Sequence, residues 1–229
     1  MPKIVLHQWL ISPYCAKVRK ALAAKQLAYE VVEYPGLLAA KAKRMGVGLL
    51  PVLDYEGERI SDSTAILRFL EARHPDPPLW PDDPRDRALA EFLEDWSDEA
   101  LFWCEGYFRL CDPVALRKSA ALLTEGRPSY ERPIMHFAAR RVFERKLAAQ
   151  GLGLLDEARI VEITRGHFDR IEVLLEDRDW LVGERQSIAD VAIAGQIGEF
   201  VRTSRFAEEL RGRAAIWNWL GRNPGGCCL

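Results

Sequence analysis

A hydroxyl and a thiol stand three residues apart at the predicted start of a helix, in the segment Ser12-Pro13-Tyr14-Cys15. Pro13 suits the first turn of a helix, where its missing N–H costs nothing, and Ser12 is a good N-cap residue. The free backbone N–H groups and the positive end of the helix dipole therefore lie beside these residues, and such a site favours a thiolate over a thiol. The segment indicates chemistry on sulfur, although a capped helix with a small buried Cys15 fits the same residues.

Further motifs follow this segment in a fixed order. Leu50-Pro51-Val52-Leu53 precedes a polar turn and then the start of another helix at Asp62-Ser63. Much later, Trp180-Leu181-Val182-Gly183 precedes a capping box made by Ser187 and Asp190. Taken together, these motifs resemble the cytosolic glutathione transferases, in particular their Ser-type or omega- and tau-like members.

The resemblance implies a two-domain protein of known architecture. An α/β thioredoxin-like N-terminal domain that binds glutathione is expected over residues 1–75, and an all-α helical C-terminal domain over residues 85–222. The proline-rich stretch 76–84 reads as the linker, because proline blocks both helix and sheet. Residues 223–229, which include Cys227 and Cys228, are expected to form a flexible tail.

The hydrophobic pattern supports this division. Between Cys111 and Ala138 prolines and a glycine interrupt the helix formers, so a break in the usual pair of long helices is expected there. Strands are expected at 3–9, 29–34, 52–55 and 59–60, and helices at 13–26, 37–46, 63–73, 85–111, 130–149, 155–177, 187–203 and 206–221.

The resemblance also implies where the glutathione sulfur and its cysteinyl backbone lie. Ser12 occupies the position that touches the sulfur, where a hydroxyl can donate a hydrogen bond to a thiolate but cannot form a disulfide. Leu50 is expected to pair with the cysteinyl backbone while its side chain packs inward, and Pro51 stands where thioredoxin-like folds hold a cis proline.

The two ends of glutathione would meet other groups. Asp62 and Ser63, at a helix N-terminus, are expected to hold the ammonium and carboxylate of the γ-glutamyl end. The position two before Pro51 is Leu49, where many members carry a polar residue, so Lys41 and Lys43 are the candidates for the glycyl carboxylate.

The second substrate is expected to be a small hydrophobic electrophile. Trp96, Trp103 and Tyr107 fall on one stripe of the predicted helix 85–111, the helix that walls the electrophile site in the family, and Trp103 and Tyr107 are the candidates for lining it. Such a stripe also fits a buried core. Lys17 and Arg19 are expected to be charges at the surface or at the domain interface.

Three functions fit these residues. The first is a glutathione transferase that activates the thiolate for attack, with Ser12 as the key group. The second is a glutathione-dependent thiol-disulfide reductase that uses Cys15. The third is a non-catalytic transferase-like module for protein interaction, which the apolar Leu49 and the unusual segment 112–133 favour.

Composition limits the remaining possibilities. The 32 basic and 34 acidic residues give a net charge of -2, so no nucleic-acid partner is expected. Five scattered cysteines indicate reduced thiols rather than a disulfide framework, and the histidines show no metal-ligand spacing, so no metal is expected. With no secretory signal and no long apolar stretch, we expect a cytoplasmic protein away from membranes, and the resemblance implies a homodimer.

Overall fold

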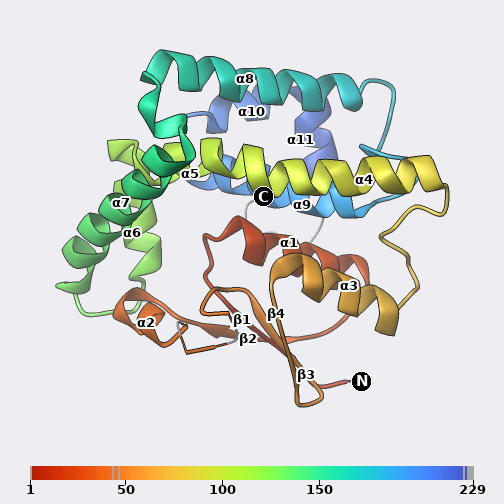
Figure 1. Cartoon of the computed structure of the whole chain (residues 1–229), viewed down its shortest axis with the longest axis horizontal. Helices are drawn as coiled ribbons and strands as arrows, with labels where there is room; N and C mark the ends of the chain where they lie inside the picture. Colours follow the sequence, from red (N-terminus) through yellow and green to blue (C-terminus); the bar gives the residue numbers. More distant parts are fainter. Residues whose placement is uncertain (1, 43, 46, 224, 226–229) are drawn as a thin grey trace.

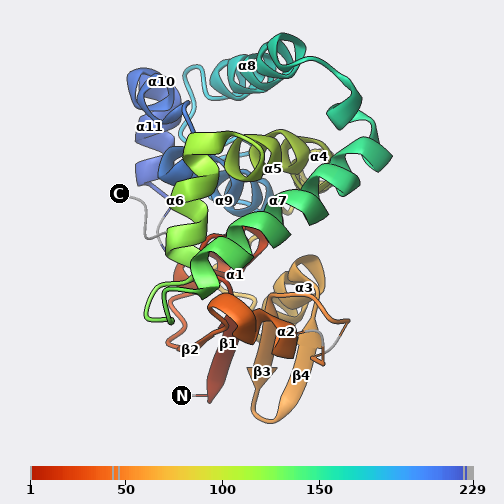
Figure 2. The same ribbon diagram turned by 90° about the vertical axis from the view of Figure 1, so that its left-hand side faces the viewer.

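The computed structural model describes residues 2–42, 44–45, 47–223 and 225. A four-stranded mixed sheet with its helices forms the N-terminal part, and the rest of the described chain is mainly helical (Figures 1 and 2). The expected fold class, a thioredoxin-like α/β unit followed by an all-α unit, is confirmed.

The sheet has the strand order β2-β1-β3-β4, with β1 parallel to β2 and antiparallel to β3. Its centre is apolar, since Leu6 of β1 and Leu53 of β3 pair in register and are fully buried. The expected helix 37–46 is instead a 3-10 turn at Gly36–Leu38 followed by a short α-helix. The elements are β1 Ile4–Gln8, α1 Pro13–Ala24, β2 Glu30–Glu33, α2 Ala39–Ala42, β3 Val52–Tyr55, β4 Glu58–Ser61 and α3 Ser63–Arg73.

The helical part differs from expectation where irregular turns interrupt the pattern. The expected helix 85–111 is divided by a π-helical turn at Ser97–Leu101, and the expected helix 206–221 is divided at Arg213, whose ψ of 89° is not helical. The segment after Cys111 holds a separate helix that starts at Pro113 behind an Asp112 cap. The helices are α4 Pro84–Trp96, α5 Phe102–Leu110, α6 Pro113–Leu123, α7 Glu131–Gln150, α8 Glu157–Leu174, α9 Ile188–Thr203, α10 Ala207–Gly212 and α11 Ala214–Gly221.

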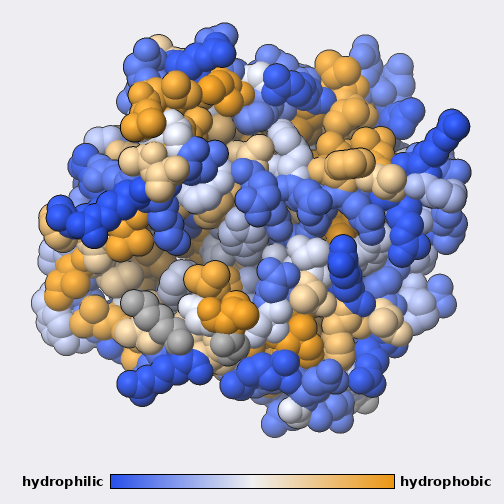
Figure 3. Space-filling model, viewed as in Figure 1, coloured by the Kyte–Doolittle hydropathy of each residue, from blue (hydrophilic) through white to orange (hydrophobic). Residues whose placement is uncertain are grey.

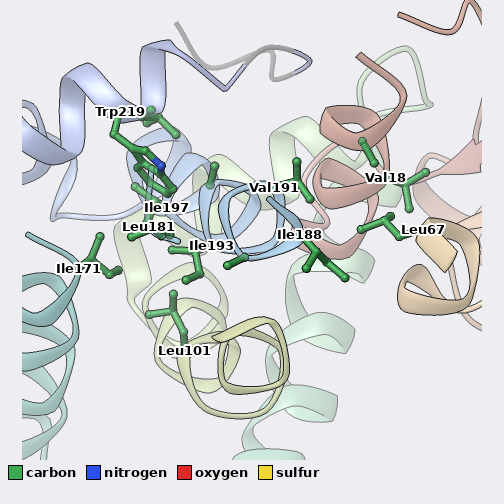
Figure 4. Packing of buried hydrophobic residues seen from close by; sticks show 14 of the residues in the cluster. Val18, Leu67, Leu101, Ile171, Leu181, Ile188, Val191, Ile193, Ile197 and Trp219 are labelled. Carbon is green, nitrogen blue, oxygen red and sulfur yellow. The ribbon is translucent and has the colours of Figure 1, made fainter. Parts of the chain in front are cut away.

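Helix α9 forms the centre of the core and is apolar on nearly every side. Its side chains point toward different neighbours: Val191 toward α1, Ile193 toward Leu101, and Ile197 toward Trp219 (Figure 4). The predicted capping box is present, because Asp190 accepts hydrogen bonds from the N–H and hydroxyl of Ser187. Buried Asp190 also accepts from the indole of Trp219, so the start of α9 is held by polar bonds inside an apolar core.

Helix α1 crosses α9 at very close range. A Cβ atom added to Gly195 would lie 2.9 Å from the carbonyl oxygen of Pro13 and 3.1 Å from the nitrogen of Lys17. Such approaches to backbone atoms leave no room for any side chain, so only glycine fits here. The crossing places the N-terminal turn of α1, with Ser12 and Cys15, directly against the helical part (Figure 1).

Charged residues of α1 are buried at this junction. Lys17 is 1% exposed, and its ammonium contacts Glu94 of α4 and Asp98 of the π-helical turn. Arg19 is 3% exposed and lies 3.9 Å from Glu199 of α9. Of the two positions expected from the sequence, surface or domain interface, the structure supports the interface. The reason is that α1 lies between the sheet and the helical part, so its outward face meets α4 and α9.

Candidate functional site

A cavity of about 440 Å³ lies between the N-terminal and helical parts. Its walls come from the start of α1, the loop before β3, the start of α3 and the facing sides of α5 and α7. The structure brings together five residues that the sequence singled out, and they line this one cavity: Ser12, Leu50, Pro51, Asp62 and Ser63.

Ser12 caps α1 from an extended backbone, with φ -88° and ψ 122°. Its Oγ accepts a hydrogen bond from the N–H of Cys15 at 3.4 Å, and the residue is 7% exposed. The hydroxyl therefore lies at the positive end of the α1 dipole and borders the cavity. A negatively charged sulfur placed beside it would be stabilised by both.

Cys15 lies one turn further in and does not line the cavity. It is completely buried, and the N–H of Trp9 donates to its Sγ at 3.5 Å. Burial raises the pKa of the thiol to about 11, and the opposing bonds from Ser12 and Trp9 are weaker effects. The neutral thiol is therefore the stable form at pH 7, whereas a reductase needs the thiolate.

The Leu50–Pro51 peptide bond is cis, as expected from the motif. The Leu50 side chain packs inward with Cys15 and Val52, so what this residue offers to the cavity is its backbone. Extended ligands with a peptide backbone can pair with such a segment.

Asp62 has an unusual backbone conformation at the start of α3. Its φ of +80° is rare for a residue with a side chain, and such strain, of order 1–3 kcal/mol, often occurs where a ligand is held. The Asp62 carboxylate accepts from the N–H of Ala65 at 2.9 Å, while buried Ser63 begins the helix. The free N–H groups of this first turn can receive a carboxylate.

A further acidic group was not foreseen from the sequence. Asp98, in the π-helical turn, lines the cavity and is held by Lys17, whose Nζ lies 2.8 Å from Asp98 Oδ2. Its Oδ1 is buried and has no hydrogen-bond partner among the described residues. Burial raises the pKa of Asp98 to about 6, with the Lys17 charge opposing. No sequence motif indicates this group, because it reaches the cavity only where α1 meets the helical part.

On the helical side, the aromatic wall of the cavity consists of Phe102 on α5 and Phe143 on α7, with ring centroids 5.9 Å apart. The candidates Trp103 and Tyr107 do not line it; they pack against Phe143 and its neighbours behind the wall. Gly106 makes this contact possible, since a Cβ atom there would lie 2.1 Å from the Phe143 ring.

The π-helical turn changes which residues share a face with Trp96. It adds one residue to the helix, which rotates everything after it by about 100° relative to Trp96. The Trp96 stripe, which contacts His167 of α8, therefore continues at buried Phe108 instead of Tyr107. A regular helical spacing across 97–101 cannot reveal this shift.

Only one of the two lysine candidates, Lys41, belongs to the described residues. Lys41 is exposed at the end of α2 and does not line the cavity, and Lys43 falls outside the described residues. Two other cations do line it, Arg109 of α5 and Lys146 of α7.

A buried polar contact joins α7 to the N-terminal part. The buried carboxylate of Glu131 accepts the N–H of Leu37 at 2.8 Å and pairs with Arg127. Gly36, with φ +55°, leaves the space that Glu131 occupies, because a Cβ there would overlap its Oε2.

Among the residues that the structure describes, no three His, Cys, Asp or Glu side chains are grouped to hold a metal ion. Within the same residues, no helix is long and apolar enough to cross a membrane.

Comparison with known proteins agrees with this geometry. Residues 6–78 match the family model described as "Glutathione S-transferase, N-terminal domain". A glutathione S-transferase from Methylobacterium radiotolerans, solved with glutathione sulfonate, is 30% identical, with a TM-score of 0.60 over 97% of this chain and 92% of that one. The chain belongs to the glutathione transferase family.

Sequence relatives within the family differ in what their names say. FtsZ-localized protein A of Caulobacter vibrioides is 28% identical over 84% of this chain and 75% of its own length. A probable maleylacetoacetate isomerase of Caenorhabditis elegans is 38% identical, but the match spans only 40% of this chain and 44% of that protein. Membership in the family therefore does not by itself give the reaction.

Proposed function

We propose that the protein is a glutathione transferase that binds glutathione in the cavity between its domains and activates the thiolate for attack on a hydrophobic electrophile. The observation that carries the proposal is that Ser12, Leu50, Pro51, Asp62 and Ser63 come from separate segments and line one cavity. In this proposal residues 1–75 bind glutathione, and residues 85–222 supply the wall for the second substrate.

Ser12 is proposed to act on the sulfur. A hydrogen bond to a charged acceptor contributes about 1.5–3 kcal/mol, and a helix N-terminus adds about 0.3–1 kcal/mol. At 1.36 kcal/mol for each pKa unit, these effects lower the pKa of the bound thiol by about 1–3 from its usual value of about 8.5. The thiolate, which is the nucleophile, is then well populated near pH 7.

The rest of glutathione is proposed to lie along the N-terminal domain. The cysteinyl backbone pairs with Leu50 beside Pro51, and the γ-glutamyl carboxylate meets Ser63 and the first turn of α3. The ammonium group lies between Asp62 and Asp98, whose unpartnered Oδ1 supports this placement. The electrophile stacks on Phe102 and Phe143.

Titration calorimetry with glutathione tests the proposal directly. We expect one site per chain, and Ser63→Ala should weaken binding by about 1–2 kcal/mol, the size of a hydrogen bond to a charged group. Ser61→Ala is the matched control, since Ser61 is not in the cavity lining. An unchanged dissociation constant for Ser63→Ala would remove Ser63 from the site.

A second function has support from other observations. The similarity to FtsZ-localized protein A, whose name gives a location and no reaction, favours a protein-interaction module. Helix α7 carries exposed Ile134, Phe137 and Val142, and hydrophobic side chains gather at the left edge of the molecule in Figure 3, where α7 lies. Absence of any heat with millimolar glutathione would favour this function over the transferase.

A homodimer that pairs through α4 is also proposed. On α4, Leu89 is 43% exposed and Phe92 is 74% exposed, and a second copy would cover them. Phe92→Asp should then convert a dimer to a monomer in sedimentation velocity, whereas Phe137→Asp on α7 should not. A wild-type chain that sediments as a monomer would refute the pairing.

A further inference from the structure

The cavity carries opposite charges at its two ends. Asp62, Asp98 and Glu99 line the end near the start of α3, whereas Arg109 and Lys146 line the end where α5 faces α7. Asp98 and Arg109 are separated by 11 residues of helix, which at 1.5 Å per residue places their Cα atoms about 16 Å apart. An anion that enters the cavity is therefore attracted to the α5–α7 end.

Arg109 is fixed beside the residue that would meet the sulfur. Its Nη1 donates to the carbonyl oxygen of Ile11 at 2.9 Å, directly before Ser12, and the residue is 8% exposed. Its Nε lies 2.8 Å from Glu105 Oε1, yet neither this Nε nor either carboxylate oxygen of Glu105 makes a hydrogen bond within the part of the chain that the structure describes. Burial raises the pKa of Glu105 to about 7, so near neutral pH this carboxyl cancels only part of the Arg109 charge.

Lys146 supplies a second cation at the mouth of the same cavity. Lys146 is exposed, and no ion pair joins it to any described residue. The nearby carboxylate of Glu144 pairs instead with Arg140 at 2.7 Å. Lys146 lies three residues after Phe143 on α7, so its side chain emerges on the face that carries the aromatic wall. These two cations and the rings of Phe102 and Phe143 thus line the same cavity as Ser12.

We propose that the second-substrate end of the cavity selects an aromatic or conjugated molecule that carries a carboxylate or sulfonate. Phe102 and Phe143 hold the unsaturated part, and Arg109 and Lys146 hold the anion. As a substrate assignment this rests on the proposed function, because it places the reacting carbon near a sulfur at Ser12. The glycyl carboxylate of glutathione has the same chemistry and is the rival ligand for Lys146.

A matched pair of fluorescent probes tests the charge preference without any turnover. 8-Anilinonaphthalene-1-sulfonate and N-phenyl-1-naphthylamine share their rings and differ in the sulfonate. The wild-type chain should bind the sulfonate probe more tightly than the neutral probe. Lys146→Gln should lower the affinity for the sulfonate probe about threefold, as expected for one exposed charge pair, and should leave the affinity for the neutral probe unchanged. Lys146→Glu should have the larger effect, and Arg145→Gln, next to it but outside the cavity lining, should have none.

Phe102→Ala tests whether both probes bind in this cavity, because it should lower the affinity for each of them by a similar factor. A sulfonate preference that survives Phe102→Ala and Lys146→Glu unchanged would overturn the proposal, since the anion would then bind elsewhere. Equal losses for both probes in Lys146→Gln would also overturn it, because the effect would not depend on charge.

Calorimetry with glutathione on the same variants separates the two sources of carboxylate. If Lys146 serves the second substrate, glutathione binds Lys146→Gln as it binds the wild-type chain. A matching loss of glutathione affinity would assign Lys146 to the glycyl carboxylate and overturn the proposal. If the wild-type chain binds no glutathione but keeps the Lys146-dependent sulfonate preference, the transferase function fails and the anion site stands.

Discussion

The ammonium of Lys17 lies 2.8 Å from Asp98 Oδ2, which fixes an acidic side chain of the helical part from a helix of the N-terminal part. Lys17 is almost completely buried and also contacts Glu94. Its positive charge partly balances the negative charge of Asp98. The other oxygen of Asp98 is left for a ligand in the cavity.

Asp98 should make glutathione binding depend on pH near 6. Its pKa is raised to about 6, so the carboxylate that attracts an ammonium group is present above this pH and is lost as the pH falls through it. Affinity should therefore rise between pH 5 and 7, and Asp98→Asn should remove this rise and cost about 1–2 kcal/mol at pH 7. Calorimetry across this range measures it.

The neighbouring Glu99 gives the control for this experiment. It also lines the cavity but is exposed, so Glu99→Gln should keep the pH dependence. If Asp98→Asn follows the same pH curve as the wild-type chain, Asp98 does not contact the ammonium group.

Ser12→Ala should raise the pKa of the thiol of bound glutathione, because the hydrogen bond that is lost stabilises the thiolate more than the neutral thiol. The rate of conjugation at pH 7 should fall by a larger factor than the affinity for glutathione. Ser12→Cys should instead place a nucleophilic sulfur at the helix N-terminus and trap a glutathione adduct detectable by mass. The thiolate absorbance of bound glutathione is measured against pH, and superimposable curves for wild type and Ser12→Ala would exclude Ser12 from the mechanism.

Cys15 is expected to be structural. Its thiol is fully buried and neutral at pH 7, so Cys15→Ala should leave conjugation within a few-fold and reduce the free energy of unfolding by about 1–2 kcal/mol. Urea unfolding and steady-state rates measure the two effects. Complete loss of disulfide reduction in a folded Cys15→Ala variant would instead support the reductase.

The close crossing of α1 and α9 predicts opposite effects for two identical substitutions. Gly195→Ala places a methyl group against the backbone of Pro13 and Lys17 and should destabilise the protein by about 1–3 kcal/mol. Gly166→Ala, within α8 and 3.8 Å or more from any neighbour, should stabilise it by up to about 1 kcal/mol through helix propensity. Thermal unfolding of both variants tests this, and a tolerated Gly195→Ala would show that the helices can separate at little cost.

The sequence predicted the parts of the molecule that depend on local pattern. Ser12 at its helix start, the cis Pro51 and the Ser187 capping box follow from motifs whose geometry is set by a few adjacent residues. The fold class followed from the order of those motifs, and five candidates line one cavity.

What the sequence could not show depends on how distant segments meet. Asp98 lines the cavity where the helical part meets α1 and Lys17 contacts it, and the extra residue in the π-helical turn moves the Trp96 stripe from Tyr107 to Phe108. Phe143 lines the cavity because α7 packs beside α5. The hydrophobic pattern of the sequence does not show where α7 lies relative to α5.

The crossing of α1 and α9 also bears on the order in which the chain can fold during synthesis. Helix α1 is synthesised well before Gly195 and before Asn223, whose carbonyl oxygen accepts a hydrogen bond from Lys20 at 2.8 Å. Until α9 has left the ribosome, the apolar face of α1 that carries Val18 has no partner in the helical half. A nascent chain that holds only the thioredoxin-like half would therefore expose a surface that chaperones recognise, and the finished protein should unfold as one cooperative unit.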